Sequence, residues 1–569
     1  MRAVNEFDIL LNHKIPVNDN VNLAVTAWIP ASSAKKHPTV LVSTPYVSNE
    51  AHPRARKYVQ RGYAMVSLDL RGRGASEGIF VPLDDHGHDV CHAIKWIKQQ
   101  AWSDGTILMR GGSYRGMTQW MAAGTCPEEI TSMIPTASVY PGRDFPTISG
   151  HRMQKYVAGW LGFVSGAASN INYYADSSYW QAKEESTFKN HTPFIDYIDD
   201  IGVSSEHYRK WIERLSSPAD WETSSLKATD YEKMKMPILS VTGHYDGDQP
   251  GALRYYNDHN NSNATDQDTV HYLVIGPWDH GGTRTPRAEL SSDITFGLNA
   301  AFDMDILNID WFDWVLGKGP KPKLLEKAVA FYVGGENKWR YADDLNAIGL
   351  DKKLFYLSAD KLESYDVFNS GHLIEEPIDN EPTHTFLSDP LDTRFLDVTD
   401  TDWNAIRDGN LRAEFPAFLP ETLVFHSKPF ETQITMAGQI LVTLFLEVNT
   451  PDVDVFTTVY AIFPDGTPLY LGGDVVRARF RNGFEPEFLE KDNVEEFVFK
   501  NYLWNAWSFP KGTRLRLSVG PYNDPSAQKN YNSGGKLGFE TKADAKTATI
   551  TLHHNKDFPS RLAFPVVEN

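Results

Sequence analysis

The sequence has few cysteines and no long apolar run. Its 569 residues include only 2 cysteines, too few for a disulfide framework and in keeping with a reducing cytoplasm. The apolar stretches are far shorter than the ~20 residues of a membrane-spanning helix. Glu6 and Asp8 stand where a signal peptide has its apolar core, so we expect neither export by that route nor a membrane partner. These absences predict a cytoplasmic protein.

Basic residues are in the minority. Lys and Arg number 55 against 74 Asp and Glu, which gives a net charge of −19. Nucleic acids and anionic membranes repel a chain of this charge, so we expect neither as a partner. The same charge is neutral or mildly favourable for a cationic substrate. The sequence does not set the oligomeric state, and a homodimer stays open.

Patterns typical of metal or nucleotide sites are also missing. No cysteines and histidines have the spacing of a zinc site. The glycine-rich loop at Gly72, Gly74 and Gly78 lacks the Gly-Lys-Ser/Thr ending of a phosphate loop, and we interpret it as a tight turn. We therefore predict no bound metal and no cofactor.

Three histidines, His86, His88 and His92, lie close enough together to resemble metal ligands. They stand among acidic residues at the start of the helix that leads to Trp96. Acidic residues complement the positive end of a helix dipole there. We interpret the segment as an exposed helix N-terminus rather than a metal site.

The chain divides into segments of different patterning, and it is too long for a single core. Residues 1–144 and 236–350 alternate strand-like and helical runs, which predicts an α/β domain. Residues 145–235 are rich in Trp, Tyr and amphipathic helical segments with no clear strand, and we expect a helical cap over the active edge. Residues 351–569 carry short β-branched and aromatic runs between turns, which predicts a β-sandwich.

Ser113 lies in the most informative motif, Arg-Gly-Gly-Ser-Tyr-Arg-Gly at residues 110–116. An apolar strand-like run precedes the motif and a helical run follows it. This arrangement raises a nucleophilic hydroxyl above an α/β-hydrolase sheet on a strained turn. The usual pattern is G-x-S-x-G, and here the second glycine comes one residue later, at Gly116. An ordinary glycine-rich turn is the alternative interpretation.

The partners of a serine nucleophile follow in the chain order Ser, Asp, His. Pro237–Thr242 predicts a buried strand that leads to Asp246, and His271–Ile275 predicts a second strand that leads to His280. Open α/β sheets collect their chemistry at the carboxyl ends of strands. We predict a catalytic triad of Ser113, Asp246 and His280, against the alternatives of a turn-forming Asp-Gly and a loop histidine.

Short segments spread over nearly the whole chain share motifs with one known group of proteins: Thr44-Pro45-Tyr46, Asp69 to Gly78, Gly111 to Gly116, Tyr245-Asp246-Gly247, Gly276 to His280, Pro464-Asp465-Gly466 and Val476 to Arg481. They resemble the cocaine-esterase and X-prolyl dipeptidyl-peptidase family of serine hydrolases, which includes the α-amino-acid ester hydrolases. The resemblance implies an α/β-hydrolase fold whose third, C-terminal domain is a jelly roll.

The resemblance agrees with the chemistry of the motif residues. Ser113 would attack the substrate carbonyl, His280 would take and return its proton, and Asp246 would orient His280. One oxyanion donor is the backbone N–H of Tyr114, the residue after the nucleophile. By resemblance the second donor is the phenol of Tyr46, for which a core or rim aromatic is the alternative. The substrate is a small ester or amide, and no cofactor takes part.

The residue two positions after the triad aspartate helps to form the substrate pocket in the resembled family. Cocaine-cleaving members carry an apolar aromatic there, whereas α-amino ester hydrolases carry a carboxylate of a cluster that holds the substrate's ammonium. This chain has Asp248, followed by Gln249 where the cluster would have a second acid. Asp144 is a further candidate. A buried carboxylate needs a cationic partner, here the substrate's amine, Arg115 or Arg143.

Aromatic residues of the expected cap, including Trp160 and Tyr173, are candidates for the walls of the pocket, with the core of the cap as the alternative. The carboxylate of Asp248 leads us to expect a preference for substrates with a free α-amino group.

Two classes of function stay open. The first is an esterase or acylase that works through an acyl-enzyme. Within it an X-prolyl dipeptidyl-peptidase is the alternative, although the chain looks short of the extra N-terminal domain of some such enzymes. The second class is a binding protein whose jelly roll recognises a carbohydrate or another partner while the hydrolase site is idle. An intact triad argues against an idle site.

Overall fold

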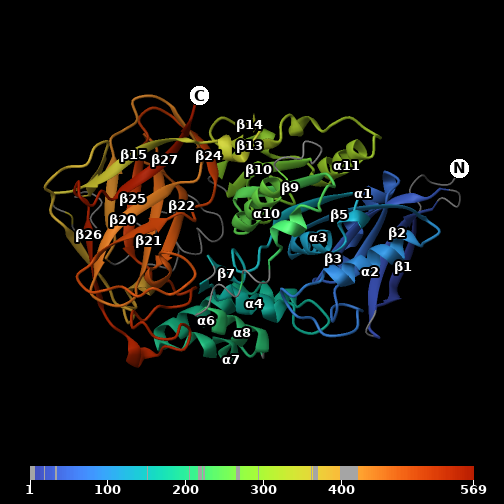
Figure 1. Cartoon of the computed structure of the whole chain (residues 1–569), viewed down its shortest axis with the longest axis horizontal. Coiled ribbons are helices and arrows are strands. Elements are labelled where there is room, and N and C mark those ends of the chain that lie inside the picture. The colour runs from blue at the N-terminus through green and yellow to red at the C-terminus, as the bar shows by residue number, and fades with distance from the viewer. Residues whose placement is uncertain are drawn as a thin grey trace.

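The computed structural model describes residues 7–17, 20–31, 35–149, 151–203, 205–215, 221, 225–263, 270–291, 294–360, 362, 370–397 and 421–568. The strands of the N-terminal half and those of the C-terminal part form two separate masses at opposite ends of the molecule (Figure 1). The helices of residues 156–214 lie along one side, between these two masses.

The N-terminal half is built on a ten-stranded sheet, which we call with its helices the α/β unit. Its strand order is β1-β2-β4-β3-β5-β6-β9-β10-β13-β14. The strands from β4 to β13 run parallel, and β1, β2 and β14 add antiparallel edges. In chain order they are β1 (Phe7–Pro16), β2 (Asn22–Pro30), β3 (His37–Thr44), β4 (Ala64–Asp69), β5 (Ser103–Ser113), β6 (Ser132–Ser138), β9 (Ile238–Tyr245), β10 (His271–Asp279), β13 (Val329–Val333) and β14 (Lys338–Ala342).

Helices cover both faces of this sheet, so the central strands are buried on both sides. Alternation along β3 places Leu41 in the core under one set of helices and Val40 and Val42 in the core under the other. The first set consists of α2 (Gly87–Lys98), α3 (Tyr114–Thr125), α9 (Ala228–Tyr231) and α10 (Gln249–Ser262); the second consists of α1 (His52–Gln60) and α11 (Met304–Val315).

Between β6 and α9 the chain forms a mainly helical segment. Its elements are β7 (Thr147–Ile148), β8 (Arg152–Met153), α4 (Tyr156–Phe163), α5 (Ile171–Tyr174), α6 (Ser177–Asn190), α7 (Tyr197–Asp200) and α8 (Glu206–Arg214). The expectation of no strand here is wrong for the short β7–β8 pair. The aromatic core of this segment includes Trp160 and packs on Tyr114 and Met117 of α3. It therefore lies against the helix that follows Ser113.

The C-terminal part is a β unit of thirteen strands with its own apolar core. Almost all of its neighbouring strands are antiparallel. The strands are β15 (Asp351–Ser358), β16 (Gly371–Ile374), β17 (His384–Ser388), β18 (Leu423–Ser427), β19 (Ile434–Gly438), β20 (Leu441–Val448), β21 (Asp454–Ile462), β22 (Pro468–Arg477), β23 (Val494–Phe499), β24 (Asn505–Phe509), β25 (Arg514–Pro521), β26 (Ala548–His553) and β27 (Arg561–Val567), with a short helix α12 (Arg394–Asp397) and, before this unit, the small hairpin β11 (Glu289–Ser291) and β12 (Ile294–Thr295).

Two buried ion pairs lie inside the β unit, and one of their arginines also reaches the segment between β6 and α9. Arg477 donates to both carboxylate oxygens of Asp454, at 2.8 and 2.7 Å, and to the carbonyl of His151 at 3.2 Å. Arg479 donates to Asp452 at 2.7 Å. The segment Val476 to Arg481, which resembled a family motif, therefore serves the junction between the two parts of the molecule.

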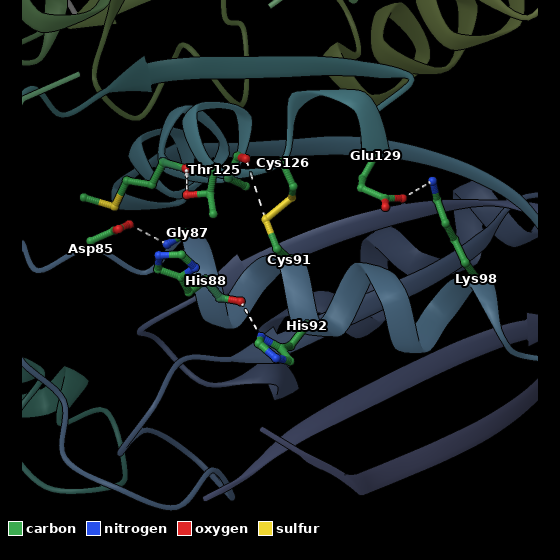
Figure 2. The surroundings of a disulfide bond; sticks show 11 residues. Asp85, Gly87, His88, Cys91, His92, Lys98, Thr125, Cys126 and Glu129 are labelled. Atoms are coloured by element: carbon green, nitrogen blue, oxygen red, sulfur yellow. Dashed lines mark hydrogen bonds and ion pairs between the residues drawn. A yellow bond between two sulfur atoms is a disulfide. The ribbon is translucent and has the colours of Figure 1, made fainter. Parts of the chain in front are cut away.

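The two cysteines form a disulfide, which the sequence analysis did not anticipate. Cys91 lies on α2 and Cys126 follows α3, and the packing of these two helices brings the sulfur atoms together (Figure 2). A spacing of 35 residues does not show this, because the contact depends on both helices covering the same face of the sheet. Disulfides are rare in reducing compartments, so this bond opposes the prediction of a cytoplasmic protein.

The three clustered histidines have different surroundings. His88 is exposed and His92 is half-buried; the ring Nδ1 of His92 lies 2.9 Å from the carbonyl of His88 (Figure 2). His86 is buried beside the phenol of Tyr114, 2.7 Å away, so the expectation of an exposed position is wrong for this residue. Within the described residues no helix combines the length and the apolar character needed to cross a bilayer.

Candidate active site

Ser113 is the last residue of β5, and the next residue begins α3. Its backbone has φ 63° and ψ −130°, a conformation that costs energy for any residue with a Cβ. Gly112 leaves room for Arg284, whose Cδ would lie 2.8 Å from a Cβ at that position. The tight strand-to-helix turn therefore presents the hydroxyl of Ser113 at the carboxyl edge of the sheet.

The late second glycine of the motif has a packing role. A Cβ on Gly116 would lie 2.3 Å from Oγ of Ser138 and 3.0 Å from its Cα, so only glycine lets the first turn of α3 approach β6 this closely. Gly111 has a matching role, because a Cβ there would lie 2.6 Å from Cβ of Arg115. The spacing that departs from G-x-S-x-G therefore still produces the strained turn.

Asp246 and His280 follow directly after neighbouring parallel strands. Strand β9 ends at Tyr245 and β10 ends at Asp279, so both strands run several residues further than the apolar runs predicted. Asp246 is completely buried and accepts hydrogen bonds from Thr242 at 3.0 Å and from the backbone N–H of Asp248 at 3.1 Å. The rigid ends of two paired strands thus position the acid and the imidazole.

The imidazole of His280 lies between carboxylates and a guanidinium. Its Nδ1 is 2.8 Å from Oδ1 of Asp246 and 3.6 Å from Oδ2 of Asp248. Its Nε2 lies 3.3 Å from Nη1 of Arg284. The hydroxyl of Ser113 donates to Oδ2 of Asp248 over 3.5 Å. The structure therefore brings the three predicted triad residues together, with Asp248 and Arg284 between the nucleophile and the base.

Burial and nearby carboxylates shift the pKa values of His280, Asp248 and Asp144. Burial disfavours the imidazolium of His280, but Asp248 and Asp246 outweigh burial and raise its pKa above the usual value. Burial is also the main reason that the pKa of Asp248 rises to about 6, with Asp246 adding to the shift. Burial and the charge of Asp248 raise the pKa of Asp144 well above its usual range.

Tyr46, the residue expected to donate to the oxyanion, lines the cavity and interacts with Ser113. The indole N–H of Trp160 donates to its phenol oxygen at 3.2 Å, which leaves the phenol proton free to point elsewhere. Burial raises the pKa of Tyr46, while hydrogen bonds with Trp160 and Ser113 and the charge of Arg115 oppose the rise. The phenol is thus a protonated donor beside the hydroxyl of Ser113.

Tyr114 is fixed by a buried network. Its phenol accepts a hydrogen bond from the backbone N–H of Leu83 at 2.8 Å and pairs with Nε2 of His86 at 2.7 Å, and its ring stacks on Trp160. Anchoring this side chain holds the first residue of α3, whose backbone N–H is one of the unpaired donors of a helix start. That N–H is the predicted second donor for the oxyanion.

A cavity of about 580 Å³ opens above Ser113. Both the α/β unit and the helical segment line it: Tyr46, Arg54, Ser113, Tyr114, Arg115, Val139, Phe145, Tyr156, Trp160, Phe163, Tyr174, Gly247, Asp248, His280 and Arg284. Of the candidates for the substrate pocket, Trp160 and Asp248 line this cavity, whereas Asp144 and Tyr173 are not among the lining residues. Asp144 accepts backbone hydrogen bonds from Tyr140 and Gly251, at 2.9 and 2.7 Å, beneath the start of α10.

The remaining candidates face other surroundings. Arg143 lines a second cavity of about 340 Å³ where the α/β unit, the segment between β6 and α9 and the β unit meet; the two cavities share only Gly247 among their described lining residues. The side chain of Gln249 exchanges hydrogen bonds with the backbone of Trp504, at 2.6 and 2.8 Å. Trp507 donates to the phenol of Tyr245 at 2.8 Å. The β unit therefore supports both ends of the loop that carries Asp246.

The ligand atoms of Asp246, Asp248 and His280 lie within 4.8 Å of one another, the single grouping of this kind among the described residues. A cation there would need Oδ1 of Asp246 and Nδ1 of His280, which already share a hydrogen bond of 2.8 Å. The donor set therefore fits an acid–imidazole pair better than a metal site.

Sequence reasoning missed Arg54 and Arg284, which line the cavity, and it placed His86 on the surface, whereas the structure buries it against Tyr114. No local motif marks either arginine, and each reaches the site only through the packing of its element against another.

Two family models match successive parts of the chain. Residues 19–282 match the model of the X-Pro dipeptidyl-peptidase (S15 family), and residues 326–563 match the model of the X-Pro dipeptidyl-peptidase C-terminal non-catalytic domain. The chain is 24% identical to a cocaine esterase of Rhodococcus sp. (strain MB1 Bresler), over 99% of this chain and 99% of that protein.

Solved structures share the fold over the whole chain. An α-amino acid ester hydrolase has a TM-score of 0.84 and 22% identity, with 100% of this chain and 98% of that chain covered. An aminopeptidase from the marine sediment archaeon Thaumarchaeota archaeon has a TM-score of 0.82 and 19% identity, with 99% and 97% covered. At these identities the likeness shows the fold alone.

Proposed function

Because the chain belongs to the X-Pro dipeptidyl-peptidase (S15) family of hydrolases, we propose that it cleaves a carboxylic ester or amide through an acyl-enzyme on Ser113. One observation carries the proposal. The strained turn presents Ser113 to a cavity that also exposes His280, and Asp246 holds that imidazole at 2.8 Å.

His280 is the general base. Its Nδ1–H donates to Asp246, so Nε2 carries the lone pair that accepts the proton of Ser113. The attack on the substrate carbonyl requires Nε2 to face Oγ of Ser113, and therefore requires Arg284 to leave its position at 3.3 Å. The imidazolium then protonates the leaving group. In the second half-reaction His280 takes a proton from water, which attacks the acyl-enzyme, and returns that proton to Oγ of Ser113 as the acyl bond breaks.

Two donors stabilise the tetrahedral oxyanion. The phenol of Tyr46 and the backbone N–H of Tyr114 flank Ser113 from different elements, and both are held by neighbours that do not react. Preorganised donors of this kind typically contribute about 3 kcal/mol each to the transition state. The charge of Arg115, whose guanidinium lies 5.4 Å from the ring of Tyr46, favours the developing anion further.

Asp248 is the single carboxylate among the described residues that line the cavity. With a pKa of about 6 it is mostly ionised at neutral pH, so it offers a counter-charge to an ammonium. We therefore expect a preference for acyl groups with a free α-amino group. An X-prolyl dipeptidyl-peptidase is the second candidate, because its substrates also present a free N-terminus.

In this proposal helices α4 to α8 and the β unit both contribute to the active site. Helices α4 to α8 act as a cap that closes the cavity, and the β unit is a jelly roll that supports the acid loop through Trp504 and Trp507. Both Gln249 and Tyr245 depend on this support, which favours an active site over an idle one.

Hydrolysis by the wild type and by Ser113→Ala tests the proposal. The panel contains p-nitrophenyl acetate and butyrate, phenylglycine methyl ester with its N-acetyl form, and Ala-Pro-p-nitroanilide. Loss of activity by ~10⁴-fold or more in the variant supports the acyl-enzyme. Equal activity of both proteins contradicts it. Equal kinetics for free and N-acetylated esters contradict the role of Asp248, and preference for the anilide favours the peptidase.

A further inference from the structure

The catalytic cavity has a cationic wall. Arg54 comes from α1, Arg115 from α3 and Arg284 from the loop after β10, and all three line the cavity beside Ser113. Asp248 is the one carboxylate among its described lining residues. The whole chain carries a net charge of −19, so this concentration of positive charge is local and opposite in sign to the average surface.

Arg284 makes no salt bridge with a carboxylate in the described part of the chain, and Asp248 is the carboxylate whose pKa its charge lowers. Nη1 of Arg284 lies 3.3 Å from Nε2 of His280, and the side chain is half-buried against the turn at Gly112. A half-buried guanidinium normally finds a carboxylate, because desolvation without a counter-charge is costly. Here its positive charge faces the open cavity.

Arg54 is only partly neutralised. Its sole ion pair among the described residues is to Asp305 at 3.7 Å, and Asp305 also pairs with Lys57 at 3.1 Å and Arg110 at 3.1 Å. The buried carboxylate of Asp305 is thus shared among three cationic side chains. Burial lowers the pKa of Arg54, and the neighbouring charge of Arg110 adds to this shift while Asp305 opposes it.

The position of Arg284 indicates which part of a substrate it meets. Nε2 of His280 is the atom that returns the proton to the leaving group, and Arg284 contacts this atom. Asp248 contacts Oγ of Ser113 instead, at 3.5 Å. Arg284 therefore lies where the leaving group departs, and its fork of N–H donors matches a carboxylate.

We propose that Arg284 and Arg54 form a subsite for a carboxylate on the leaving group, so that the preferred substrates are esters of hydroxy acids or amides of amino acids. This rests on Ser113 acting as the nucleophile. The substrate's carboxylate draws the guanidinium of Arg284 away from Nε2 of His280, which frees that nitrogen to accept the proton of Ser113. Together with Asp248, the cavity then suits a substrate with an ammonium on the acyl part and a carboxylate on the leaving group.

A matched pair of esters tests the subsite. We would measure kcat/KM for 3-acetoxybenzoate and 3-acetoxybenzamide, which share the acetyl group and differ in the charge of the leaving group. The wild type should prefer the carboxylate by roughly tenfold or more, the usual size of a charge-assisted hydrogen bond. Arg284→Gln should bring the ratio close to one, and Arg54→Gln should lower it by a smaller factor.

Arg61→Gln is the matched control. Arg61 follows α1, pairs with Asp313 at 3.9 Å and does not line the cavity, so its loss removes one positive charge without altering the ratio. A wild-type ratio near one overturns the subsite. An equal fall for both esters in Arg284→Gln also overturns it, because Arg284 would then only position His280.

Direct binding separates this proposal from the proposed function. The product 3-hydroxybenzoate should bind the wild type at least tenfold more tightly than Arg284→Gln by titration calorimetry, whereas 3-hydroxybenzamide should bind both alike. Binding without hydrolysis of either ester would contradict the function and keep the subsite. Hydrolysis with no difference in binding between the two proteins would contradict the subsite alone.

Discussion

Asp246 at the carboxyl edge of the sheet and Asp454 in the β unit are both almost completely buried, yet their charges are balanced differently. Asp454 receives two hydrogen bonds from Arg477 and a third from Asn530 at 2.8 Å. Burial would raise its pKa, but Arg477 and Asn530 outweigh burial and lower it. Asp246 has a hydroxyl, a backbone N–H and one imidazole as partners, with a second carboxylate, Asp248, close by.

The difference separates a structural group from a reactive one. A carboxylate paired with a permanently charged guanidinium does not change its protonation state at neutral pH. Such a pair joins two parts of the chain. A carboxylate paired with an imidazole shares a proton that moves near neutral pH. Incomplete neutralisation around His280 and Asp248 is therefore a sign of function, and complete pairing around Asp454 is a sign of architecture.

Of the substitutions that test this comparison between Asp246 and Asp454, Asp246→Asn should have the largest effect. The amide keeps the shape of the side chain but no longer stabilises the imidazolium or the correct tautomer of His280, so kcat should fall by ~10⁴-fold. Steady-state kinetics on the best ester of the panel measure this change. The thermal unfolding midpoint should stay close to that of the wild type, and a fall in kcat of less than tenfold would contradict the assignment of the acid.

Asp454→Asn should have the opposite pattern, a loss of stability with little change in kcat. It leaves Arg477 buried without its counter-charge, which should cost about 3–5 kcal/mol of unfolding free energy, while kcat of the folded enzyme changes little. Urea unfolding followed by tryptophan fluorescence measures the first quantity. Asp492→Asn, an exposed change in the same unit, is the control and should be neutral. An unchanged urea midpoint for Asp454→Asn would show that the pair is not structural.

The stability and the activity of the protein should be lost at different acid pH values, because they depend on Asp454 and His280 respectively. The pKa of Asp454 is lowered on folding, so its stabilising contribution is present above the unfolded pKa and is lost only as pH falls through the lower folded value. His280 must be neutral to act as the base, and its pKa is raised. Activity should therefore fall on the acid side at a higher pH than stability does.

Asp248→Asn should give the smallest change, a shift in the pH profile. Among the charges that raise the pKa of His280, Asp248 ranks first, so its removal should move the acid limb of kcat/KM to lower pH. Asp258→Asn on α10 removes a carboxylate outside the cavity and should leave the limb in place. If the acid limb of kcat/KM does not shift in Asp248→Asn, a group other than Asp248 determines the pH of that limb.

The family resemblance predicted from the motifs is confirmed, as are an α/β N-terminal half and a β-rich C-terminal part. The predicted domain boundaries, the cap and the jelly roll stay predictions. Ser113, Asp246 and His280 could be located because each comes at the end of an apolar run, and parallel strands bring their carboxyl ends to one edge. Local sequence carries that information.

The groups that escaped prediction depend on contacts between distant elements. Arg54 reaches the cavity from α1 and Arg284 from the loop after β10, and nothing near either residue marks it as part of the site. Gln249 was expected at the position of a second acid, but its amide bonds the backbone of Trp504, 255 residues away. Such roles follow from how distant elements pack against one another, which no local pattern records.

Covalent labelling tests the central claim most directly. The intact protein would be treated with a fluorophosphonate and the modified residue found by peptide mass spectrometry. We expect one adduct on Ser113 in the wild type and in folded Asp454→Asn, a strongly slowed reaction in Asp246→Asn and none in Ser113→Ala. An adduct on a different residue, or equal labelling rates for the wild type and Asp246→Asn, would contradict the account.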